Sequence, residues 1–108
     1  MSTEKELFVI FTTAPEADIA EKIARTLVEE RLAACVQIIG PIKSLYRWDE
    51  KLTEDKEFLI LIKAPKDTFE KLERRLREIH PYEVPEIVAI SAEKTSRDYL
   101  EWAFSQVG

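Results

Sequence analysis

The 108-residue sequence predicts one α+β domain over residues 1–108, with the order β-α-β-β-α-β followed by an extra helix. Three observations support this fold class. Four short segments are rich in apolar β-forming residues, and three other segments repeat apolar residues at helical spacing. The length and the 45% hydrophobic content suit one domain with one core. In this order two helices cover one face of a four-stranded antiparallel sheet, which is the ferredoxin-like sandwich.

The first strand and the first helix are predicted from the residues that follow the polar start of the chain. Leu7–Phe11 is a continuous apolar run, which indicates a buried strand. Thr13 stands three residues before Glu16, the spacing of a capping box, and Pro15 suits a first helical turn. Apolar residues then recur at helical spacing, so we expect the helix to continue to about Arg31.

A long β-hairpin is predicted next. Its first strand covers Ala34–Ile39 and resumes over Ile42–Trp48, and the intervening Gly40–Pro41 pair indicates a bulge or a bend. Asp49–Asp55 is polar and predicts a turn, after which Glu57–Lys63 forms the return strand. Because both strands are long, we expect the hairpin to extend past the body of the domain.

The last third of the chain predicts a helix, a strand and a final helix. Asp67 and Glu70 form a capping pair at the start of the second helix. After a loop that contains two prolines, Ile87–Ile90 predicts the fourth strand. Thr95 or Ser96 is expected to cap the last helix.

The predicted strands are almost continuously apolar instead of alternating, which indicates a sheet that is buried on both faces. The helices of one domain cover only one face. At roughly 25 cal/mol per Å², an open apolar face of several hundred Å² would forfeit many kcal/mol. We therefore expect the sheet to pack against other copies of the chain, with the hairpin adding its strand to a neighbour.

Charge and composition narrow the possible partners and compartment. The net charge of −5 argues against nucleic acid, and the basic residues of Arg74–Arg77 lie among glutamates, as on a solvated helix face with ion pairs. No apolar run is long enough to cross a membrane, and Met1–Glu6 does not have the pattern of a signal peptide. With a single cysteine, Cys35, the chain is expected to be cytoplasmic. Its Lys/Glu enrichment suits a thermostable protein.

The sequence contains no recognisable catalytic constellation. It has no nucleophile elbow, phosphate loop or zinc-ligand spacing. Cys35 follows two alanines and is expected to be an ordinary buried thiol. We therefore predict that the protein is not an enzyme.

The loop Ile79–Ile87 is the strongest candidate for a site. It holds the only histidine, His80, and its prolines Pro81 and Pro85 restrict the backbone at both ends. A rigid loop that presents an imidazole, the Tyr82 phenol and two carboxylates suits a binding site. The alternative is that the prolines only end one element and begin the next.

A divalent metal such as copper or zinc is one candidate ligand of this loop. His80 could bind it together with Glu83 or Glu86. Tight copper or zinc sites use three or four nitrogen or sulfur donors, so we expect weak, pH-dependent binding. The alternative is that His80 only forms hydrogen bonds at the end of a helix.

The hairpin and the end of its return strand offer further candidates. Tyr46 and Trp48 share one face of a strand, which favours a protein interface over a ligand platform. Lys63 is either an ordinary solvated strand end or the cation of a cleft in which Glu57 and Glu86 are counter-charges.

Several ordered motifs resemble the CutA divalent-cation tolerance family across almost the whole chain: Val28–Cys35, Ser44–Trp48, Lys56–Glu57 with Ile62–Lys63, His80–Ile87 and Tyr99–Trp102. The resemblance implies a ferredoxin-like protomer, a homotrimer, a cytoplasmic or organellar setting, and a role in tolerance to copper and other divalent ions. It also implies a cleft between subunits at Tyr46, Trp48, Glu57, Lys63, His80, Tyr82 and Glu86.

Two positions depart from the copper-binding members that this family contains. Those members have a cysteine after the first strand and a second histidine before the loop histidine, whereas this chain has Thr12 and Ile79 there. Two metal donors are therefore missing. The resemblance leaves two alternatives open. One is a PII-like signalling module that binds a small anionic metabolite through Lys63, and the other is a purely structural trimer.

Overall fold

The computed structural model describes residues 5–108, and its elements follow the predicted order. The N-terminal residues 1–4, which entered the signal-peptide prediction, lie outside the described residues. The sheet order is β2-β3-β1-β4 and every pairing is antiparallel. The elements are β1 Leu7–Ala14, α1 Ala17–Glu29, β2 Cys35–Trp48, β3 Lys51–Pro65, the 3-10 turn η1 Lys66–Thr68, α2 Phe69–Ile79, β4 Val88–Ser91 and α3 Arg97–Ser105.

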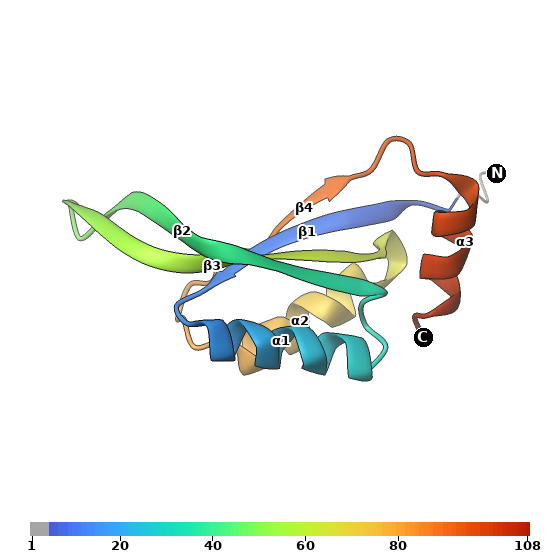
Figure 1. The fold of residues 1–108 in the computed structure, drawn as a ribbon, viewed down its shortest axis with the longest axis horizontal. Coiled ribbons are helices and arrows are strands. Elements are labelled where there is room, and N and C mark those ends of the chain that lie inside the picture. The colour runs from blue at the N-terminus through green and yellow to red at the C-terminus, as the bar shows by residue number, and fades with distance from the viewer. Residues whose placement is uncertain (1–4) are drawn as a thin grey trace.

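The core lies between the sheet and the two helices that cover one of its faces, α1 and α2 (Figure 1). Strand register sets this face, because Ile10 pairs with Ile62 and the two side chains point the same way. Leu27 of α1 and Leu72 of α2 meet them from the helix side, and all four side chains are completely buried. The predicted α+β sandwich is therefore confirmed for the single chain.

The predicted caps of α1 and α2 are wrong, whereas Ser96 takes the N-cap position of α3 as predicted, without a side-chain cap hydrogen bond. Thr13 does not cap α1, because β1 continues to Ala14 and Thr13 pairs with Leu59 of β3. Glu16 takes the N-cap position and makes no side-chain cap hydrogen bond. Asp67 lies inside η1 and does not cap α2. At Thr13, the backbone hydrogen bonds between β1 and β3 extend the strand past the position where the local pattern predicts a helix cap.

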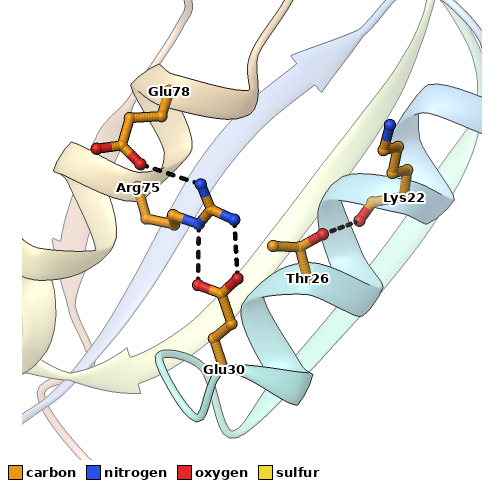
Figure 2. A network of polar contacts seen from close by, with 5 residues as sticks. All are labelled: Lys22, Thr26, Glu30, Arg75 and Glu78. Carbon is orange, nitrogen blue, oxygen red and sulfur yellow. Dashed lines mark hydrogen bonds and ion pairs between the residues drawn. The ribbon is translucent and has the colours of Figure 1, made fainter.

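Beyond the core, α1 and α2 are joined by a surface ion-pair network (Figure 2). Arg75 of α2 donates two hydrogen bonds to the Glu30 carboxylate at the end of α1, at 2.9 and 2.8 Å, and a third to Glu78 at 3.0 Å. The hydrogen bonds from Arg75 lower the pKa of Glu30. These contacts confirm that part of the basic segment Arg74–Arg77 forms ion pairs on an exposed helix face.

The hairpin of β2 and β3 projects from the domain, whose longest dimension is 48 Å (Figure 1). The predicted bulge is confirmed by a register shift between Ile39 and Ile42, at the cis peptide bond Gly40–Pro41. The predicted turn Asp49–Asp55 is wrong, because only two residues lie between the strands. Asp49 and Glu50 have φ values of 51° and 60°, as in a type I′ turn. The polar residues after them are strand residues of a projecting arm.

Among the described helices, only α3 packs against the other face of the sheet, at the end where Leu7 lies, and the rest of that face has no helix over it (Figure 1). Pairing places Val9 opposite Ile90 and Phe11 opposite Val88 on this face, with Leu61 of β3 on the far side of Phe11. In the single chain Val88 is 50% exposed and Ile90 is 54% exposed. An apolar sheet face is thus left open to solvent, as the two-sided apolar pattern of the strands predicts.

Candidate functional site

A cleft of about 660 Å³ lies between the hairpin and the loop 80–87 that follows α2. The hairpin and β1 contribute one part of its lining, and the loop contributes the rest. Six predicted site residues line it, and they are Tyr46, Trp48, Glu57, Tyr82, Glu83 and Glu86. Neither His80 nor Lys63, the other two predicted site residues, is among the lining residues.

His80 anchors the loop instead of facing the cleft. It is only 8% exposed, and its backbone N–H donates to the Leu76 carbonyl at the end of α2. Its Nδ1 accepts a hydrogen bond from the Tyr82 backbone N–H at 3.1 Å, so its Nε2 carries the proton that is donated to the Thr13 carbonyl at 2.7 Å. Burial lowers the pKa of His80. Both ring nitrogens of this neutral imidazole are therefore occupied by backbone groups.

Glu57 is the most deeply placed acid of the cleft, with only 7% of its surface exposed. Its Oε2 accepts a hydrogen bond from the Tyr82 hydroxyl at 2.7 Å. Burial, followed by the hydrogen bond and the charge of Glu57, raises the pKa of Tyr82, so the phenol stays protonated and keeps donating. Within residues 5–108 no lysine, arginine or histidine forms an ion pair with Glu57.

A second phenol–carboxylate pair lies on the hairpin. Tyr46 donates its hydroxyl hydrogen to Asp55, and this hydrogen bond raises the pKa of Tyr46. Asp55 also lines the cleft, and it is not among the predicted site residues because its segment was assigned to a turn. Strand alternation could have identified it, because Asp55 stands two residues before Glu57 on the same face of β3.

Lys63 lies away from the cleft. In β3 it pairs with Cys35 of β2, and its ammonium group donates to the Gln37 side chain. Cys35 itself is half-buried, not fully buried as predicted. Within one chain, the structure does not bring the predicted cation Lys63 together with Glu57 and Glu86.

The described residues also do not assemble a metal centre. Nowhere in residues 5–108 do three or more His, Cys, Asp or Glu side chains gather closely enough to hold a metal ion. Glu83 and Glu86 line the cleft and are exposed, but His80 would have to leave its backbone partners to join them. The cleft can offer carboxylate oxygens and aromatic faces, which attract cations without forming a tight transition-metal site.

Fold and site together define a class. The chain is a ferredoxin-like α+β protein with a projecting hairpin, an uncovered apolar sheet face and an acidic cleft lined by aromatic side chains. No helix in the described part of the chain is long and apolar enough to cross a membrane.

Comparison with known proteins then gives the family. The family model of the CutA1 divalent ion tolerance protein matches residues 8–106. The divalent-cation tolerance protein CutA of Thermus thermophilus is 45% identical over 100 residues, which cover 93% of this chain and 97% of that protein. The chain therefore belongs to the CutA1 divalent ion tolerance family, as the motifs predict.

Two further comparisons agree with this assignment. A solved structure of the Thermus thermophilus divalent cation tolerance protein superposes with a TM-score of 0.92 at 44% identity, covering 94% of this chain and 99% of that one. The Arabidopsis thaliana protein named "Protein CutA, chloroplastic" is 38% identical over 94 residues, which are 87% of this chain and 52% of that protein. These relatives are named for CutA or for tolerance to divalent cations, and none of the names states a reaction.

Proposed function

We propose that this chain is a non-enzymatic homotrimer that takes part in tolerance of divalent metal ions, and that its ligand sites are clefts completed at the subunit boundaries. The observation that carries the proposal is the uncovered apolar sheet face beside an acidic cleft. The family supports the connection to divalent cations. The expected compartment is the cytoplasm, whereas two relatives bear chloroplast names and one relative with a solved structure is named periplasmic.

The exposed apolar surface supports assembly. Val88 and Ile90 are about half exposed on the helix-free face, and Leu52 near the hairpin tip is 76% exposed. Each fully buried aliphatic side chain is worth about 1.5–3 kcal/mol relative to exposure, so several such residues favour association strongly. A hairpin that projects from the body can reach a neighbouring subunit, and the edge strand β2 can pair there.

Metal binding in the cleft is proposed to be weak. Glu83 and Glu86 supply hard oxygen donors, and His80 would join them only after breaking its hydrogen bonds to Thr13 and Tyr82. Copper and zinc prefer nitrogen and sulfur donors, which the cleft offers only through that rearrangement. An anionic metabolite is disfavoured, because the lining is acidic and Lys63 lies outside it.

Titration with copper and zinc tests the proposal. We expect both ions to bind with modest affinity that falls at low pH, since protons compete for carboxylate and imidazole ligands. Glu83→Gln and Glu86→Gln should each weaken binding, whereas Glu21→Gln on the exposed face of α1 should not. His80→Ala measures the contribution of the imidazole. Equal binding by the Glu83, Glu86 and Glu21 variants would contradict a site in the cleft.

A further inference from the structure

Glu57 is the most deeply buried carboxylate of the cleft. Only 7% of the residue's surface is exposed, yet its carboxylate accepts one hydrogen bond within the described chain, from the Tyr82 hydroxyl to Oε2. No hydrogen bond to Oε1 is formed by residues 5–108, and no cationic side chain there neutralises the charge. A buried carboxylate is costly without a cation or several donors, so Glu57 favours a positively charged ligand.

The acidic groups occupy both walls of the cleft. Asp55 and Glu57 lie on the hairpin wall, and Glu83 and Glu86 lie on the loop wall. No lysine or arginine is among the lining residues. The two phenols, Tyr46 and Tyr82, hold one carboxylate each by hydrogen bonds and remain neutral donors. The cleft therefore presents four separated carboxylates, of which Asp55 and Glu57 are held in place by the phenols.

The other residues that line the cleft favour an organic cation over a bare metal ion. A volume of about 660 Å³ is in the range of small-molecule sites, and aromatic faces contribute to the walls through Tyr46, Trp48 and Tyr82. Aromatic faces bind ammonium groups by cation–π attraction and cover methylene groups by apolar contact. A metal ion would need converging ligands, which the described residues do not assemble.

We propose that the cleft binds a linear organic amine that carries two or more ammonium groups joined by methylene chains. One ammonium group pairs with Glu57 beside the Tyr82 ring, and the methylenes cross the aromatic lining toward the carboxylates of the loop. This inference rests on the proposed function in two respects, which are that the cleft is the ligand site and that the subunits which complete it place no lysine or arginine against Glu57. It assigns the chemical class of the ligand to that site.

Calorimetric titration with spermidine and putrescine at about 0.15 M salt tests the proposal, because that ionic strength screens loose surface attraction. We expect spermidine to bind more tightly than putrescine, and neutral 1,4-butanediol and anionic succinate not to bind. Glu57→Gln should weaken spermidine binding by at least about tenfold, because a charge-assisted hydrogen bond is lost. The matched control is Glu29→Gln, which removes the same charge from an exposed position on α1 and should bind like the wild type.

A second pair of variants keeps the test decisive if Glu57→Gln does not fold. Tyr82→Leu removes the ring beside Glu57 and should bind spermidine more weakly, whereas Trp102→Leu removes an exposed ring of α3 outside the cleft and should bind like the wild type. Absence of spermidine binding, or equal weakening by Glu57→Gln and Glu29→Gln, would overturn the proposal. Copper binding without spermidine binding would overturn it while leaving the proposed function intact. Spermidine binding by a chain that is monomeric in solution would support this ligand class and contradict the proposed trimer.

Discussion

Tyr82 donates its hydroxyl hydrogen to Glu57 over 2.7 Å, and this bond joins the loop after α2 to the inner part of the hairpin. The two residues are 25 positions apart in the sequence. His80 prepares the contact, because its imidazole binds the Tyr82 backbone on one side and the Thr13 carbonyl on the other. The histidine thus positions the loop, while the tyrosine and the glutamate face the cleft.

Removal of the Tyr82 hydroxyl should destabilise the fold. Tyr82→Phe keeps the ring but leaves the buried Glu57 carboxylate without its donor, a loss of about 1–3 kcal/mol in the free energy of unfolding. Urea denaturation at a fixed protomer concentration measures it. Tyr46→Phe is the matched control, because it deletes the same group from an exposed pair with Asp55 and should cost less. An equal loss in both variants would contradict the special position of Glu57.

Stability should fall in mild acid because of His80. Its pKa in the folded chain lies below the ordinary 6.5, chiefly because the ring is buried. As the pH falls through about 6.5, the unfolded chain therefore takes up a proton before the folded chain does. The contribution of His80 is complete above that pH and is lost as the pH approaches the folded pKa.

The matched variant for this pH effect is His80→Gln, whose amide can hydrogen-bond but does not titrate. Denaturation curves between pH 7.5 and about pH 5 should show a steeper loss of stability for the wild type than for the variant. Parallel pH profiles would mean that His80 does not make this contribution.

The bulge at Gly40 should not accept a side chain without cost. A Cβ at this position would collide with the Phe58 ring, so Gly40→Ala should destabilise the protein by about 1–3 kcal/mol. In a Phe58→Leu background the ring is gone, and the same alanine substitution should cost less. The double-mutant cycle measures this difference. A cost that is unchanged by Phe58→Leu would assign the effect to the backbone and not to the ring.

The apolar patterns and their periodicity were sufficient to predict the order of the strands and helices. Local polar residues predicted the caps and turns less reliably. The Gly40–Pro41 bulge was predicted because glycine and proline fit poorly inside a regular strand. The predicted Thr13 cap was wrong because Thr13 pairs with Leu59, a strand residue 46 positions away. A local sequence pattern carries no information about such a distant partner. The predicted turn over Asp49–Asp55 was wrong because polar residues occur in a solvent-exposed strand of a projecting hairpin as well as in a turn.

The site was predicted in part for similar reasons. Tyr82 and Glu57 could be named from their motifs, but their hydrogen bond depends on how the loop folds against the hairpin. For Lys63 the sequence left two interpretations open, a solvated strand end or the cation of a cleft with Glu57 and Glu86. The register pairs Lys63 with Cys35, whereas Glu57 is paired with Ile42 beyond the bulge. Because the two residues are six positions apart on one strand, the rise of the strand alone separates them by roughly 20 Å, which the sequence spacing already implies.

The central claim is that the uncovered apolar sheet face drives assembly. Ile90→Asp places a charge on that face, and Lys22→Asp on the exposed side of α1 changes charge away from the sheet and the hairpin and serves as the control. Light scattering should give the wild type and the control a mass of three times the 12.6 kDa chain, and should give Ile90→Asp a lower mass. A wild-type mass of one chain would contradict the account.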